Sequence, residues 1–263
     1  MEICNTNRII QGLWIGPELS TMEQLSISSF LINGHEYHLY TYGEVQNIPA
    51  GTIVKDGNEI LPAASIFQYK HQPTYAGFAN FFRYKLLLER GGWWGDTDMV
   101  CLKPLDFPEE QIFATEICRG EEVVTSGIIK APRGSAAMAY AWEVCQSKKP
   151  EQLVWGETGP RLMGETVRKF SLENFRKPSY IFCPIGYADW HRVLETEVEV
   201  DLKGAYTIHL WHERWRATGQ DKDAVYPANC LFEQLKKQYG HKQAQKAQAM
   251  HPTLGVTTPL KSV

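Results

Sequence analysis

The sequence lacks several features that would place it in a large class of proteins at once. Positive charge is not in excess, because 27 Lys and Arg residues stand against 30 Asp and Glu residues in 263, a formal net charge of −3. Nucleic-acid-binding proteins usually carry a basic excess, so we expect no nucleic-acid partner. No apolar run approaches the roughly 20 residues that span a bilayer. The N-terminus MEICNTNRII has no charged leader before an apolar segment, which predicts no signal peptide.

The cysteines also lack the spacing of a metal cage or a disulfide framework. None of the six forms a CxxC pair, and they lie far apart along the chain at Cys4, Cys101, Cys118, Cys145, Cys183 and Cys230. Zinc cages and small disulfide-rich domains both need closely spaced cysteines. We therefore expect a reduced, cytoplasmic protein.

What the chain does contain is ordinary globular composition with many aromatic rings. Hydrophobic residues make up 43% and charged residues 22%, and there are 8 Trp, 12 Tyr and 11 Phe residues. Residues 8–15 and 36–42 are typical of buried strands, and residues 20–32 between them are typical of a helix. This β-α-β beginning predicts an α/β fold with a parallel sheet.

The rest of the pattern predicts one domain with a C-terminal addition. Pro73 near the start and Gly91-Gly92 at the end bracket a helix with an aromatic stripe, and an extended run, 93–102, follows it. We expect a loop over 43–64, strands over 111–117, 123–130, 179–183 and 205–211, and helices over 134–147 and 158–170. We assign residues 1–230 to the domain and 231–263 to a helical and frayed extension.

The segment Gly92-Trp-Trp-Gly-Asp96-Thr-Asp98 carries the strongest chemical signal. Two carboxylates at positions i and i+2 of an extended backbone point to the same face. Hard cations such as Mg²⁺ and Mn²⁺ prefer carboxylate oxygens, and magnesium sites often combine one or two carboxylates with substrate phosphates. Asp96 and Asp98 therefore predict metal-bridged binding of a diphosphate. A polar turn with two solvated aspartates is the alternative, since the tripeptide alone is common.

The surroundings of this pair resemble a known family. The run from Phe78 to Asp106, with Arg83-Tyr84, Gly91-Gly92 and Lys103-Pro104-Leu105, is similar to the family 32 glycosyltransferases, known for a sugar-binding region containing a DXD motif. The opening segment 8–17 and Thr158-Gly159-Pro160 resemble the family more loosely. The clostridial glucosylating toxins share this core and a Trp-Ile-Gly segment.

The resemblance implies a GT-A fold, which is a single Rossmann-like domain with a mixed, mainly parallel sheet that binds a nucleotide-sugar with Mn²⁺ or Mg²⁺. It also implies sugar transfer with retention of anomeric configuration. Carried over to this chain, Trp14 stacks on uracil and Arg83 contacts the donor sugar and phosphate. Asp96 reaches ribose and sugar hydroxyls, and Asp98 ligates the metal. Asn80 stands where the family has Asp, so it can bind a sugar hydroxyl but brings no charge.

Three further residues complete the expected donor and metal site. His209 ends an apolar strand, where related enzymes supply a histidine ligand, and His212 is its rival on the opposite strand face. Trp211 is expected to help cover the donor. Thr97, between the two aspartates, is assigned to donor binding.

These features predict a hexosyltransferase that uses a UDP-sugar and a glycan, lipid-linked or other hydroxyl acceptor in surface polysaccharide synthesis. One alternative is a non-catalytic protein that binds nucleotide-sugars or glycans, which Asn80 favours. Another is a haloacid-dehalogenase-like phosphatase, because Asp96-Thr-Asp98-Met-Val fits its nucleophile motif. The basic stretch 236–246 suggests peripheral contact at the inner face of the membrane, with a solvated helix face as the simpler interpretation.

Overall fold

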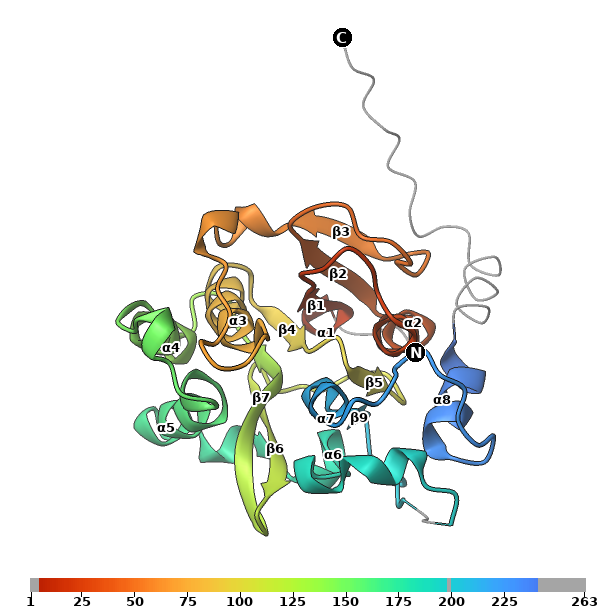
Figure 1. Cartoon of the computed structure of the whole chain (residues 1–263). Coiled ribbons are helices and arrows are strands. Elements are labelled where there is room, and N and C mark those ends of the chain that lie inside the picture. The colour runs from red at the N-terminus through yellow and green to blue at the C-terminus, as the bar shows by residue number, and fades with distance from the viewer. Residues whose placement is uncertain (1–4, 198–199, 241–263) are drawn as a thin grey trace.

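The computed structural model of the protein describes residues 5–197 and 200–240 (Figure 1). Within these residues, seven strands form one sheet in the order β3-β2-β1-β4-β7-β6-β8. They are β1 (Ile9–Leu13), β2 (Glu36–Thr41), β3 (Ile53–Asp56), β4 (Gly92–Gly95), β6 (Ile112–Cys118), β7 (Glu121–Ala131) and β8 (Arg176–Lys177). Strands β5 (Met99–Cys101) and β9 (Thr207–His209) pair antiparallel in a small second sheet.

Helices cover both faces of the large sheet (Figure 1). They are α1 (Asn5–Arg8), α2 (Thr21–Ile32), α3 (Ala76–Arg90), α4 (Ala136–Gln146), α5 (Leu162–Lys169), α6 (Ser179–Phe182), α7 (His212–Thr218) and α8 (Leu231–Tyr239). Short 3₁₀ turns occupy Gly57–Glu59, Ala63–Ser65, Pro150–Gln152, Glu173–Phe175 and Tyr187–Leu194, and a π-type turn occupies Glu157–Arg161. None of the described helices is long and apolar enough to cross a membrane.

The sheet confirms the expected α/β fold class. Strands β3, β2, β1 and β4 run parallel to one another, and β7 runs antiparallel to both β4 and β6. The β-α-β beginning is present as β1, α2 and β2. Helix α2 connects β1 to β2 and helix α3 lies between β3 and β4, whereas β2 and β3 are joined by a loop. Because the four strands are parallel, their carboxyl ends meet at one edge of the sheet.

Adjacent residues of the central strands supply two separate hydrophobic clusters. Trp93 packs in the cluster beneath α2, whereas Trp94 packs in the cluster beneath α3 and α4. Ile128 and Ile129 of β7 divide in the same way. This alternation is the period of two expected of a strand that is buried on both faces.

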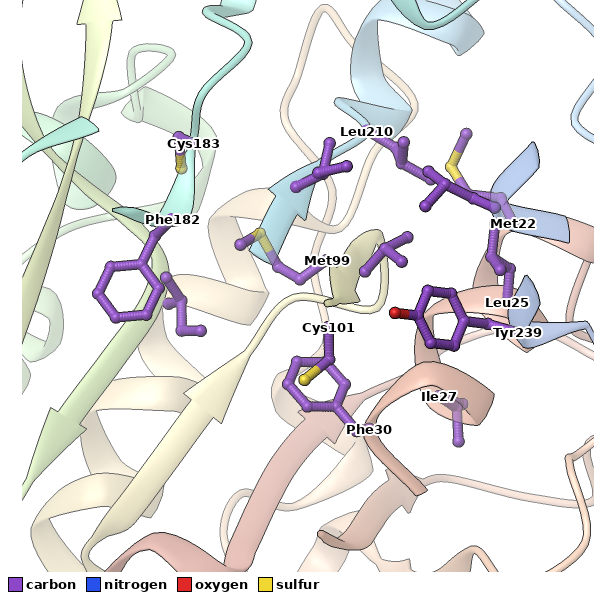
Figure 2. Close-up of a cluster of buried hydrophobic side chains, with 14 of the residues drawn as sticks. Met22, Leu25, Ile27, Phe30, Met99, Cys101, Phe182, Cys183, Leu210 and Tyr239 are labelled. Carbon is purple, nitrogen blue, oxygen red and sulfur yellow. The ribbon is translucent and has the colours of Figure 1, made fainter. Parts of the chain in front are cut away.

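The first cluster joins segments that are distant in the sequence (Figure 2). Met22 and Leu25 of α2, Met99 of β5 and Leu210 after β9 lie together there, and Tyr239 of α8 is buried with them. Helix α8 thus packs on the same core as the small sheet. The division at residue 230 remains a prediction, and residues 241–263 of the expected extension lie outside the described part of the chain.

Three sequence predictions of local structure are wrong. The expected loop over 43–64 contains the edge strand β3, whose pairing with β2 is a long-range contact that local turn residues did not reveal. The expected strand over 179–183 is the one-turn helix α6, because the Cys183 amide donates to the Ser179 carbonyl directly after Pro178. The extended run over 93–102 is broken by a turn at 96–98, closed where the Met99 amide donates to the Asp96 carbonyl at 3.0 Å.

Candidate active site

A cavity of about 1350 Å³ opens at the carboxyl ends of β1 and β4. Trp14 follows directly after β1, Asp96 follows directly after β4, and both line it. Ligands of open α/β sheets bind at this edge, outside the carboxyl ends of the parallel strands. The structure gathers all the site residues expected from the sequence in the wall of this one cavity: Trp14, Asn80, Arg83, Asp96, Thr97, Asp98, His209 and Trp211.

The turn after β4 and the small sheet bring Asp98 and His209 together. Met99 pairs with His209 across β5 and β9, and the Leu210 amide donates to the Asp98 main-chain carbonyl at 2.9 Å. As a result, Nε2 of His209 lies 3.2 Å from Oδ2 of Asp98. The same Oδ2 accepts the main-chain amide of His212 at 2.8 Å, at the start of α7.

Asp96, Asp98 and His209 form a compact set of cation ligands. One ligand atom from each residue lies within 4.8 Å of the other two. Burial alone would raise the pKa of Asp98, but His209 and the His212 amide hold it below its usual range. Burial would likewise lower the pKa of His209, yet the Asp98 carboxylate raises it well above its ordinary value. The pair is therefore a buried charge pair in the absence of another cation.

Arg83 fixes the other aspartate. Its guanidinium lies 3.0 Å from Oδ1 of Asp96, stacks over the Trp94 ring at 4.8 Å, and donates to the Ser126 carbonyl. The Trp94 indole also donates to Asp96 Oδ1, at 2.8 Å. Burial raises the pKa of Asp96, and the charge of Arg83 opposes that shift. Arg83 is 3% exposed, so it is a structural partner of the turn and not a surface arginine.

A bulge in β7 provides main-chain hydrogen-bond acceptors for Arg83 and Asp96. Thr125 to Ile128 in β7 stand opposite the single residue Ala114 in β6. The bulge turns the Ser126 carbonyl toward Arg83 and the Gly127 carbonyl toward the Asp96 amide, at 2.8 Å. Bulges often re-aim backbone groups beside active sites in this way.

Gly127 leaves room for the ligand set. A Cβ atom there would lie 3.0 Å from Cε1 of His209 and 3.4 Å from Oδ2 of Asp96. Both neighbours are held by the contacts described above, so neither can withdraw freely. The position therefore needs glycine for space.

We expect Gly127→Ala to lower the free energy of unfolding by about 1–3 kcal/mol, the usual cost of overpacking a rigid interior site. Gly43→Ala is the matched control, because a Cβ atom at Gly43 meets no atom within 4 Å. Urea unfolding of both variants measures the difference. Equal unfolding free energies would show that the space at Gly127 is not required.

Asn80 and Thr97 also line the cavity. The Asn80 side-chain amide donates to Thr158 Oγ1 at 3.3 Å, and its carbonyl accepts from Ser126 Oγ at 3.5 Å. Thr158 belongs to the Thr158-Gly159-Pro160 segment noted in the sequence. Thr97 sits in the turn between the two aspartates and lines the cavity.

Trp14 lies in a cluster of charged and aromatic groups. The His212 ring is stacked at 6.4 Å between centroids, and Lys222 Nζ lies over the indole at 5.4 Å. Lys222 pairs with the fully buried Glu23 of α2 at 2.6 Å. His212 begins α7 and does not lie on a strand, so the expectation that it faces away from His209 on a strand is wrong.

Trp211 packs against the His209 ring. Its ring stacks on the His209 imidazole at 3.7 Å between centroids, and its indole donates to the Ile185 carbonyl at 2.9 Å. Its backbone is left-handed, with φ of 60°, which turns the chain from β9 into α7. Whether Trp211 covers a donor stays a prediction.

Glu116 of β6 is a cavity residue that no sequence motif marked. It is 6% exposed, and burial raises the pKa of its carboxyl to about 7. The surrounding segment is typical of an ordinary strand, so composition and spacing carried no signal for it. Gly127 and Ser126 were likewise missed, because their roles depend on the register of β7.

Comparison with known protein families gives a match that includes Asp96 and Asp98. The model of the family "Glycosyltransferase sugar-binding region containing DXD motif" matches residues 22–117. A search of curated proteins found no match.

Several solved glycosyltransferase structures are similar to the chain at low identity. The "PaToxG Glycosyltransferase" is 13% identical, with a TM-score of 0.48, over 93% of this chain and 87% of that one. The glycosyltransferase GlyE of Streptococcus pneumoniae TIGR4 is 13% identical, with a TM-score of 0.44, over 90% and 65%. The catalytic domain of alpha-toxin from Clostridium novyi is 8% identical, with a TM-score of 0.35, over 88% and 76%.

The family match confirms the resemblance seen in the sequence, because it includes helix α3, the two aspartates and most of strand β6. Residues 22–117 are therefore similar to the sugar-binding region of glycosyltransferases that carry a DXD motif.

Proposed function

We propose that the protein transfers a hexose from a nucleotide-sugar, in particular a UDP-sugar, to a hydroxyl acceptor. The observation that carries the proposal is the convergence of Asp96, Asp98 and His209 in a cavity also lined by Arg83 and Trp14. The expected donor needs this combination of a cation site for the diphosphate and an aromatic ring for the base.

The donor set fits a divalent cation. Two carboxylates and one imidazole, with ligand atoms within 4.8 Å of one another, suit Mn²⁺ or Mg²⁺. We assign Asp98 as the main ligand, with Asp96 and His209 beside it. When bound, the cation supplies positive charge against the negative charge that develops on a departing diphosphate.

The remaining residues position the donor. Arg83 holds a fixed positive charge on the cavity wall and is able to bind the phosphate or the sugar. Asn80 offers an amide that can pair with a sugar hydroxyl, with Thr97 nearby in the turn. We propose retention of configuration through attack from the leaving-group face, with Trp211 covering the donor.

The acceptor and setting follow from the family resemblance. We propose a glycan or lipid-linked acceptor in surface polysaccharide synthesis, with the reaction in the cytoplasm. Of the basic stretch proposed for contact with the inner face of the membrane, Lys236 is already engaged, because it pairs with Glu233 and donates to the Ala224 carbonyl. Residues 241–246 of that stretch lie outside the described residues.

A screen of nucleotide-sugars for Mn²⁺-dependent release of the nucleoside diphosphate tests the proposal. We expect one UDP-sugar to be hydrolysed, and EDTA to stop the reaction. Tight binding of a nucleotide-sugar without turnover under any metal would favour the non-catalytic alternative. Release of inorganic phosphate from simple phosphate esters would favour the phosphatase.

Replacing Trp14 with Ala is expected to weaken UDP binding by roughly 1–3 kcal/mol, the range for stacking of a base on an aromatic ring. Trp142→Ala is the control, because Trp142 packs on Phe81 and is not part of the cavity lining. Calorimetric titration with UDP measures both. Unchanged affinity in Trp14→Ala would make Trp14 a packing residue.

A further inference from the structure

Glu116 is a buried acidic group in the cavity for which the proposed function has no use. The residue is 6% exposed, it lines the cavity, and its Oε2 atom has no hydrogen-bond partner among the described residues. The Thr125 side chain provides a hydrogen bond to the carboxyl. Burying a carboxylate with an unpaired oxygen is costly, so packing alone does not explain this residue.

The position of Glu116 is adjacent to the cation ligands but separate from them. Thr125, its neighbour, begins the bulge of β7 that contacts Arg83 through Ser126 and Asp96 through Gly127. The charges of His209 and Asp96 both act on the Glu116 carboxyl. In the described part of the chain, however, the compact ligand set contains only Asp96, Asp98 and His209.

We propose that Glu116 accepts a hydrogen bond from a hydroxyl group of the donor sugar and so selects which sugar is used. This inference rests on the proposed function. The unpartnered Oε2 atom of Glu116 is able to accept a hydrogen bond, and sugar hydroxyls are donors of the matching kind. The sugar of a nucleotide-sugar is bonded to the phosphate that the cation site holds, so its ring falls next to that site, where Glu116 lies.

The chemistry also explains why the oxygen is left unpaired. A buried acceptor that only the correct hydroxyl can satisfy rejects a donor that lacks this hydroxyl, because the acceptor then stays desolvated and unpaired. Discrimination of this kind works through binding of the sugar and leaves binding of the nucleotide unaffected. The two parts of the donor can therefore be tested separately.

The test compares binding of UDP with binding of UDP-sugars, in the presence of Mn²⁺, for the wild type, Glu116→Gln and Glu116→Ala. UDP affinity is expected to stay within about twofold in all three. Affinity and hydrolysis of the preferred UDP-sugar are expected to fall about tenfold to a hundredfold in the variants, the range for loss of a hydrogen bond to a charged group. Glu143→Gln, which removes an exposed carboxylate on α4, is expected to match the wild type.

Glu116→Gln keeps the side-chain volume, and thermal unfolding confirms that each variant is folded. Wild-type affinity and hydrolysis of the UDP-sugar in folded Glu116→Ala would overturn the role of Glu116 while leaving the proposed function in place. A sugar covalently attached to Glu116, detected by mass spectrometry, would overturn it in favour of a nucleophile. Failure of the wild type to bind UDP would overturn the proposed function, and this role with it.

Discussion

Replacing Asp98 with Asn is expected to lower Mn²⁺-dependent release of UDP from the donor by about 10²–10³-fold, the loss typical when one group that stabilises developing charge is removed. Asp98 is held ionised by His209 and by the His212 amide, so it can offer a charged oxygen to a cation without first losing a proton. Asn keeps the shape of the side chain but offers only a neutral oxygen. Initial rates of UDP release against Mn²⁺ concentration measure the effect.

The matched control for this variant is Asp221→Asn. Asp221 is exposed and accepts the Asp223 amide in a surface turn far along the chain from the two aspartates. We expect its rate and metal dependence to equal those of the wild type. If folded Asp98→Asn released UDP at the wild-type rate, Asp98 would have no part in the reaction.

Replacing Arg83 with Ala is expected to lower the free energy of unfolding by about 1.5–3 kcal/mol, the range for losing hydrogen bonds to a charged group, because the Asp96 side chain left behind is 26% exposed. Arg83 is 3% exposed and joins Asp96, the Trp94 ring and the Ser126 carbonyl. Its removal leaves the Asp96 carboxylate to be neutralised or rehydrated. Guanidinium unfolding monitored by tryptophan fluorescence measures the change.

A second substitution separates the ion pair from simple packing. Arg83→Met with Asp96→Asn removes both charges, so we expect the double variant to be more stable than Arg83→Met alone. Arg90→Ala, at the exposed end of the same helix, breaks a half-exposed pair with Glu59 and is expected to cost less than about 1 kcal/mol. Equal losses of unfolding free energy in Arg83→Ala and Arg90→Ala would show that the partly buried Arg83–Asp96 pair contributes no more to stability than an exposed pair.

The sequence allowed site residues to be predicted where several of them lie in one short segment. The helix before Gly91 and the two aspartates after it lie in one short segment. The spacing of the aspartates predicted a cation site, and the family resemblance of the segment added Arg83. His209 was predicted as a ligand because related enzymes supply a late histidine and this one ends an apolar strand. The parallel half of the sheet was predictable because β1, α2 and β2 follow one another with clear periodicity and stop signals.

The sequence was uninformative where the site depends on pairing between distant segments. The bulge in β7 is defined by its pairing with β6, which the spacing of residues in the sequence does not reveal. For that reason the need for glycine at position 127 and the place of Glu116 in the cavity wall could not be inferred from the sequence. The turn at Asp96 replaces the extended backbone first expected there. Even so, the two aspartates converge, because β5 pairs with β9 and anchors the Asp98 side of the turn.

Diffraction from crystals soaked with Mn²⁺ and UDP, collected for anomalous scattering from manganese, tests the central claim most directly. The account predicts one strong manganese peak in contact with Asp98, with Asp96 and His209 beside it and the diphosphate on its open side. A well-occupied UDP molecule in this cavity with no manganese at these side chains, or a manganese peak bound elsewhere, would contradict it.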